Sequence, residues 1–190
     1  MPAFTEDNRP ALPGRKDAAE RRAEMIRVDH AGEHGAVRIY EGQLAVLGRR
    51  PSTRASAATI KKMADQEQHH LDTFNRLVAE HNVRPTALQP LWDVAGFALG
   101  AATALMGEKA AMACTAAVED VIDEHSAAQE RELKDDTSEF KEVVSKFRQE
   151  EIEHKETALA EGAEQAPGYE VLSATIKAGC RLAIKLSEKI

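Results

Sequence analysis

The feature that most constrains the fold is a pair of Glu-x-x-His motifs, Glu67–His70 and Glu151–His154, whose glutamates lie 84 residues apart. One solitary glutamate precedes each motif, Glu33 by 34 residues and Glu119 by 32. All of them interrupt apolar stripes of helical spacing. Residues three apart on a helix project to the same side, so each motif sets a carboxylate beside an imidazole. The chain must therefore bury a polar layer inside a helical core.

Four segments carry apolar residues in alternating steps of three and four, the stripe that a bundle helix buries. We predict these bundle helices at 18–48, 53–82, 108–134 and 138–162. Two further helical segments, 89–106 and 169–188, are apolar or amphipathic. The prediction is an all-α fold: a four-helix bundle with two additional helical segments.

The buried carboxylates predict a metal site. A carboxylate in an apolar core is costly unless it is paired or bound to a cation, and several at one level repel each other. Two divalent metals would remove both costs. The predicted metal ligands are Glu33, Glu67, His70, Glu119, Glu151 and His154.

Neighbouring polar residues are assigned by their position on the helix. His69 lies off the buried stripe, so His70 is preferred as the ligand. Glu151 combines the right spacing with a stripe position, whereas Glu150 and Glu153 are expected to face solvent.

Other polar and small residues leave alternatives open. His30, one turn before Glu33, either supports a ligand or is a satisfied core histidine. His34 and His81 are expected at the surface. Glycines beside Glu33, such as Gly32, suggest close approach by another helix or by a substrate, because glycine costs about 1 kcal/mol inside a helix.

The motif alone is weak evidence, since about one Glu-x-x-His is expected by chance in a chain with 22 Glu and 7 His. The coincidence of two motifs and two solitary glutamates on four buried stripes is stronger. Carboxylates with imidazoles and no thiolate favour iron or manganese over structural zinc. Iron is the redox-active choice.

The amino-acid composition limits the possible binding partners and the cellular compartment of the protein. The net charge of −7 argues against nucleic-acid binding. Two cysteines, Cys114 and Cys180, do not make a disulfide framework and indicate a reducing compartment. The longest uncharged run, 94–107, has 14 residues, fewer than the roughly 20 that a membrane span needs. The segments 91–106 and 169–188 are either core or a surface that lies on a membrane, and we favour the membrane.

Several strings resemble the demethoxyubiquinone hydroxylases of ubiquinone biosynthesis, over about residues 25–190. They are far more specific than Glu-x-x-His. The matching strings are Arg27–Glu33, Asp65–Glu67, Arg84–Thr86, Pro90–Trp92, Gly96–Gly100, Ala111–Thr115 and Ala178–Arg181.

The resemblance implies a ferritin-like di-iron monooxygenase that hydroxylates the ring of a polyprenyl demethoxyubiquinol. It implies two iron ions, O₂ as co-substrate and NADH as electron source. By position, it implies the same six ligands as the stripes do. It further implies a ferritin-like domain at 18–190 after a flexible tail at 1–17. The expected location is peripheral, on the cytoplasmic face of a bacterial inner membrane, with a homo-oligomer and partner proteins of the pathway left open.

Rival functions stay open at this point. A ferritin-like iron-binding protein or ferroxidase uses the same bundle but predicts a polar exterior. A hydroxylase or desaturase with another substrate and a metal-free structural bundle are the remaining alternatives. Metal content and lipid association distinguish them.

Overall fold

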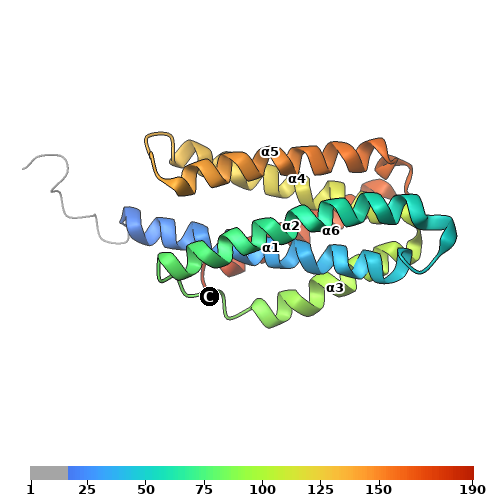
Figure 1. Ribbon diagram of the computed structural model, residues 1–190, viewed down its shortest axis with the longest axis horizontal. Coiled ribbons are helices and arrows are strands. Elements are labelled where there is room, and N and C mark those ends of the chain that lie inside the picture. Colours follow the sequence, from blue (N-terminus) through green and yellow to red (C-terminus); the bar gives the residue numbers. More distant parts are fainter. Residues whose placement is uncertain (1–16) are drawn as a thin grey trace, which may run out of the picture.

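The computed structural model describes residues 17–190, which form α-helices, two short 3-10 helices and no strand (Figure 1). The prediction of an all-α fold is confirmed. The helices are α1 (Ala18–Leu47), α2 (Arg54–Glu80), α3 (Gln89–Met106), α4 (Glu108–Glu132), α5 (Glu139–Ala160) and α6 (Tyr169–Ser187), with η2 (Pro51–Thr53) and η3 (Ala163–Gln165) between them. Every helix predicted from the sequence is present, with ends within two residues.

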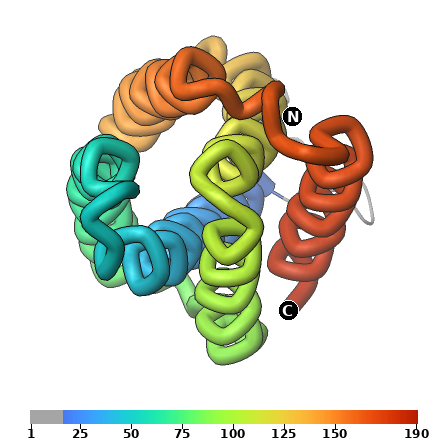
Figure 2. The backbone as a smooth tube through the Cα atoms, turned by 90° about the vertical axis from the view of Figure 1, so that its right-hand side faces the viewer, coloured from blue at the N-terminus to red at the C-terminus, as the bar shows by residue number. Residues whose placement is uncertain are grey.

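The bundle consists of α1, α2, α4 and α5, with α1 packed on α2 and α4 packed on α5. The other two helices lie outside it, α3 along α1 and α6 along α4. Figure 2 shows this arrangement end-on, with α6 (red) standing beside the bundle. The two extra segments of the sequence are thus appended to the bundle rather than inserted into it.

The helix boundaries follow from local chemistry. The Asp17 side chain accepts from the backbone N–H of Glu20, and the Glu20 side chain accepts from that of Asp17, a reciprocal cap. Gly107 separates α3 from α4 with φ of 123°, a conformation that disfavours any side chain. The predicted tail lies outside the described residues except for Asp17, which belongs to the start of α1.

Two apolar clusters fill the bundle on either side of the polar layer. One contains Tyr40, Ile60, Met63 and Met112. The other contains Ile26, Phe74, Leu77, Phe140 and Phe147. Each fully buried large side chain of this kind contributes about 1.5–3 kcal/mol. The apolar layers therefore stabilise a bundle whose middle is costly to bury.

The contact between α1 and α3 depends on glycine. A Cβ atom on Gly100 would overlap the carbonyl oxygen of Ile39, and one on Gly42 would overlap that of Phe97. A Cβ on Gly96 would lie 2.8 Å from the carbonyl oxygen of Gly35. The two backbones therefore touch at Gly42, Gly96 and Gly100, whereas a Cβ on Gly32 or Gly35, the glycines beside Glu33, would meet no close neighbour.

None of the helices in residues 17–190 combines the length and the hydropathy needed to cross a membrane. Large apolar side chains are nevertheless exposed on the two outer helices. They are Leu91, Val94, Leu105 and Met106 on α3 and Val171 and Leu182 on α6, each more than half exposed.

Candidate metal centre

The six predicted ligands converge in the middle of the bundle. Glu33 comes from α1, Glu119 from α4, and the two motifs from α2 and α5. All six are buried, and Glu67 and His70 have no exposed surface. Their stripe positions explain the convergence, because each stripe faces the bundle axis.

Two overlapping groups of side chains could each hold one metal ion. The first group is Glu33, Glu67, His70 and Glu151, and the second is Glu67, Glu119, Glu151 and His154. Within each group the potential ligand atoms lie within 4.8 Å of one another. Glu67 and Glu151 belong to both groups, so they are placed to bridge two ions, while Glu33 and Glu119 are placed to bind one ion each.

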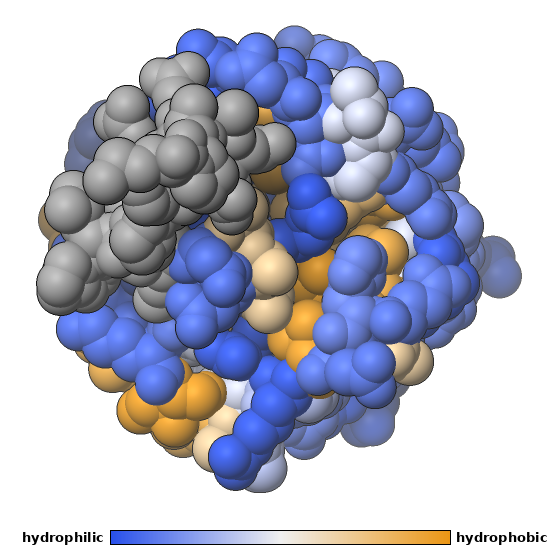
Figure 3. Space-filling view, turned by 90° about the vertical axis from the view of Figure 1, so that its left-hand side faces the viewer, coloured by the Kyte–Doolittle hydropathy of each residue, from blue (hydrophilic) through white to orange (hydrophobic). Residues whose placement is uncertain are grey.

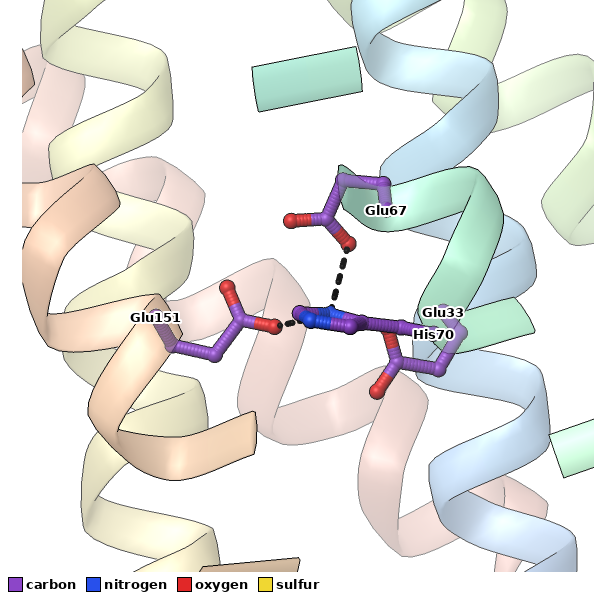
Figure 4. A group of neighbouring side chains, drawn as sticks. All are labelled: Glu33, Glu67, His70 and Glu151. Carbon is purple, nitrogen blue, oxygen red and sulfur yellow. Dashed lines mark ion pairs between the residues drawn. The ribbon is translucent and has the colours of Figure 1, made fainter. Parts of the chain in front are cut away.

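Figure 4 shows the first group, in which carboxylates from α1, α2 and α5 surround the His70 ring. Nδ1 of His70 lies 3.0 Å from Glu151 Oε1, 3.5 Å from Glu33 Oε2 and 3.8 Å from Glu67 Oε2. In the second group, Nδ1 of His154 lies 2.9 Å from Glu67 Oε1 and 3.2 Å from Glu151 Oε2. Both histidines thus direct Nδ1 towards the carboxylates.

The residues fit a pair of metal ions. Within residues 17–190, both carboxylate oxygens of Glu67 and Nδ1 of His70 are buried without an aligned hydrogen-bond partner, although charged groups lie close by. Buried polar atoms normally have such partners. Four carboxylates and two imidazoles are also the donor set that carboxylate-bridged di-iron bundles use.

Burial raises the pKa of Glu33, Glu67 and Glu119, because water no longer solvates their charged forms. Burial acts in the same direction on Glu151, but the two neighbouring histidines outweigh it and lower the pKa to about 2. Glu151 is therefore the carboxylate that stays ionised when the others are protonated.

Burial lowers the pKa of His70 and His154, but the attraction of the neighbouring carboxylates outweighs it in both cases. The pKa of His70 rises to about 12, with Glu151 and Glu33 as partners. That of His154 rises to about 9, with Glu151 and Glu67 as partners. Without metal, the cluster thus holds protons where cations would sit, and metal binding must release them.

The outer nitrogen of each histidine contacts a residue that the sequence did not mark as functional. Nε2 of His70 lies 2.7 Å from Glu150 Oε2, and Nε2 of His154 lies 3.2 Å from Gln66 Oε1. The prediction that Glu150 faces solvent is wrong, because its side chain reaches across from α5 and is only 24% exposed. His69 and Glu153 are exposed, as predicted.

Aromatic side chains cover the cluster. The Phe147 ring stacks on His70 with ring centroids 3.9 Å apart. Tyr40 lies edge-on to His154 and donates a hydrogen bond of 3.0 Å to Glu119 Oε1. Burial raises the pKa of Tyr40 well above 10, so its hydroxyl keeps its proton.

The remaining histidines are outside both ligand groups. His30 is a buried core histidine: its Nε2 lies 3.0 Å from Asn75 Oδ1, while its Nδ1 has no aligned hydrogen-bond partner within residues 17–190. His34 is not a free surface residue, since it is half-buried and lies 3.3 Å from Asp93 at the start of α3. His125 lies 3.3 Å from Asp29, and His81 is exposed as predicted.

An apolar groove of about 470 Å³ adjoins the cluster, between α1, α3, α4 and α6. A small cavity at the ligands shares Gly32, Ala36 and Ile122 with this groove. Trp92 Nε1 donates to Ser187 Oγ at 3.1 Å, which joins the start of α3 to the end of α6. Figure 3 looks at the end of the bundle where α1 begins and shows apolar surface in a hollow between hydrophilic side chains.

The sequence is similar to one family over most of its length. The family model of the ubiquinone biosynthesis protein COQ7 matches residues 20–187. A 3-demethoxyubiquinol 3-hydroxylase from Rhodospirillum rubrum is 55% identical over 179 residues, which cover 94% of this chain and 83% of the relative.

Eukaryotic relatives match almost as well. The human NADPH-dependent 3-demethoxyubiquinone 3-hydroxylase, mitochondrial, is 53% identical over 87% of this chain and 76% of its own length. The yeast (Saccharomyces cerevisiae) 5-demethoxyubiquinone hydroxylase, mitochondrial, is 43% identical over 87% of this chain and 77% of its own length.

Proposed function

The chain belongs to the COQ7 family of ubiquinone biosynthesis proteins, and we propose that it hydroxylates the ring of a polyprenyl demethoxyubiquinol. The reaction would use two iron ions held by the six predicted ligands. The observation that carries this proposal is the pair of overlapping ligand groups, buried in the bundle beside an apolar groove.

Bound at this site, the two irons would supply the electrons that reduce O₂. The protein's own contribution would be to hold the ions close together, because Glu67 and Glu151 belong to both ligand groups. Phe147 and the apolar clusters exclude water from the reacting ring. Exclusion of water strengthens electrostatic interactions and prevents side reactions.

The groove supports a hydrophobic substrate. It extends along α1 between α3 and α6 and is lined largely by apolar side chains, such as Ile39, Leu99 and Ile176. A quinol ring entering through it meets the small cavity at Gly32 and Ile122, next to Glu33. Gly32 and Gly35 of α1 line this groove, which supports the role in substrate access among the two that the sequence left open.

We further propose that the exposed apolar side chains of α3 and α6 lie on a membrane. A polyprenyl tail stays in the bilayer, so the groove needs an opening at its surface. Val94 on α3 and Leu182 on α6 are exposed large apolar residues on the two helices that border the groove. Flotation with liposomes measures this association, and a folded chain that stays with the soluble fraction contradicts it.

The electron donor is proposed as a reduced nicotinamide nucleotide. The names of several relatives specify NADPH, whereas NADH was expected from the sequence resemblance. Comparison of the rates of quinol hydroxylation with NADH and with NADPH decides between them. The expected bacterial location and the pathway partners remain predictions.

Complementation tests the proposed activity. A ubiquinone-deficient strain blocked at the demethoxy intermediate is transformed with this chain, and its quinones are analysed by mass spectrometry. Restored ubiquinone supports the proposal, and continued accumulation of the intermediate by a folded, iron-loaded protein contradicts it. His70→Ala should fail to complement, while the adjacent exposed substitution His69→Ala serves as the matched control.

The ferritin-like iron store is the second function that the sequence allowed. The exposed apolar surface of α3 opposes it, because a soluble iron store needs a polar exterior. Size-exclusion chromatography measures the difference: a large shell supports the iron store, and a small, lipid-associating particle supports the hydroxylase.

A further inference from the structure

The surroundings of the two histidines differ, although the ligand groups are matched. Each imidazole directs Nδ1 to the centre and Nε2 outwards. The outer acceptor of His70 is a carboxylate, Glu150, at 2.7 Å. That of His154 is an amide, Gln66, at 3.2 Å. A ring that binds a metal through Nδ1 carries its proton on Nε2, so both outer groups act as acceptors.

The difference breaks an internal symmetry of the chain. Gln66 immediately precedes Glu67, and Glu150 immediately precedes Glu151. Each outer group therefore comes from the equivalent position of the opposite motif and reaches across the contact between α2 and α5. The two halves of the molecule thus place an amide and a carboxylate at equivalent points.

A second difference also makes the group that contains His154 the weaker set of electron donors. Tyr40 donates a hydrogen bond to Glu119, in the group that contains His154. A donated hydrogen bond withdraws electron density from a carboxylate ligand. The position seven residues after Glu119, which corresponds to Tyr40 after Glu33, is Ser126, with a much shorter side chain.

We propose that the two metal positions are chemically inequivalent, and that Glu150 and Gln66 are positioning residues that set the difference. A carboxylate acceptor makes the imidazole a stronger donor to the metal than an amide does. The position held by Glu33 and His70 therefore binds metal more tightly and fills first. This inference rests on the proposed di-metal site and adds an order of filling to it.

Stepwise loading of the metal-free, full-length chain with Co²⁺ under anaerobic conditions tests the proposal. Calorimetry gives the two dissociation constants, and proton NMR detects the exchangeable Nε2–H of a histidine bound to Co²⁺. We expect wild type to bind in two steps. Glu150→Gln should weaken the first step about tenfold, in line with the usual effect of such outer partners, and should shift the N–H signal seen at one equivalent.

The exchange of the two outer groups provides the sharpest variant. In the double variant Gln66→Glu/Glu150→Gln the total charge is unchanged, and we expect the order of filling to reverse. The N–H signal that appears second in wild type should then appear first. Glu153→Gln removes the same charge from an exposed position on α5 and is the matched control. Circular dichroism checks that each variant is folded.

The outcomes separate this inference from the proposed function. A wild-type chain that binds no Co²⁺ contradicts both. Suppose that wild type binds in two steps and that Glu150→Gln changes this binding no more than Glu153→Gln does. That result contradicts only the proposed inequivalence. A double variant that keeps the wild-type order of filling also contradicts it, whatever the single variants do.

Discussion

The contact between α1 and α3 and the contact between α2 and α5 hold helices together by opposite means. Between α1 and α3, glycines bring backbone against backbone, as at Gly100 and Ile39. Between α2 and α5, ionisable side chains meet at the cluster, as at Glu150 and His70, beside aromatic contacts such as that of Phe74 with Phe147. The first contact is set chiefly by shape, although His34 and Arg38 of α1 also pair with Asp93 of α3. The second depends on which cations, protons or metals, occupy the cluster.

Removal of a bridging carboxylate should have the largest effect. Glu151 belongs to both ligand groups, so Glu151→Ala takes a ligand from each metal position. We expect loss of bound iron and of hydroxylase activity while the helices persist. Iron analysis, circular dichroism and a quinol hydroxylation assay measure these effects. Full activity in this variant would refute the ligand assignment.

A change of pH should have the next largest effect, and it should act mainly on the contact between α2 and α5. The raised pKa values of His70 and His154 mean that the folded, metal-free chain holds protons that the unfolded chain loses above about pH 6.5. Their stabilising contribution is complete below that pH and is lost as pH rises towards about 9 and beyond. Each extra proton that the folded chain holds lowers the free energy of unfolding by about 1.4 kcal/mol for every unit that the pH rises.

Stability of the chelator-treated chain should therefore fall by a few kcal/mol between pH 6.5 and 8.5. The raised pKa values of Glu33 and Glu119 act in the same direction. The low pKa of Glu151 matters only below about pH 4.5. Denaturant unfolding at the two pH values measures the change, and equal stability at both would show that the cluster holds no extra protons.

The α1–α3 contact should respond to a single methyl group. Gly100→Ala places a Cβ atom on the carbonyl oxygen of Ile39, so the helices must separate. We expect a loss of about 1–3 kcal/mol in the free energy of unfolding, as for other overpacked sites. The loss should be the same at pH 6.5 and 8.5. A loss that varied with pH would show that shape alone does not set this contact.

The smallest effect is expected for a glycine without close neighbours. A Cβ on Gly179 of α6 would meet no atom within 4 Å, so Gly179→Ala gains helix propensity without a clash. We expect stabilisation of up to about 1 kcal/mol. The same substitution thus has opposite signs on α3 and α6. Destabilisation by Gly179→Ala would indicate that α6 packs against a close neighbour at this position.

The sequence predicted the helices and the six converging residues because both depend on local periodicity. Glu67 and His70 share one face through helix geometry alone, and the buried stripe fixes which way that face points. Glu150 was missed for the complementary reason. It lies one position off the stripe, and its partner depends on how α5 crosses α2, which no local pattern encodes.

Other parts of the site also depend on tertiary geometry. His34 was assigned to the surface because the path of α3 over α1, which half-buries it beside Asp93, leaves no signal in the sequence around it. The orientation of the imidazoles, with Nδ1 inwards, likewise follows from backbone placement. The matching positions of Gln66 and Glu150 before the two motifs were visible in the sequence and could have pointed to their shared role.

The hydrogen bond between Trp92 and Ser187 ties the start of α3 to the end of α6 at one end of the groove. Neither outer helix contributes a residue to the two ligand groups, so this tie lies outside the cluster. The width of the groove at this end and the spacing of the ligands are therefore set by different residues.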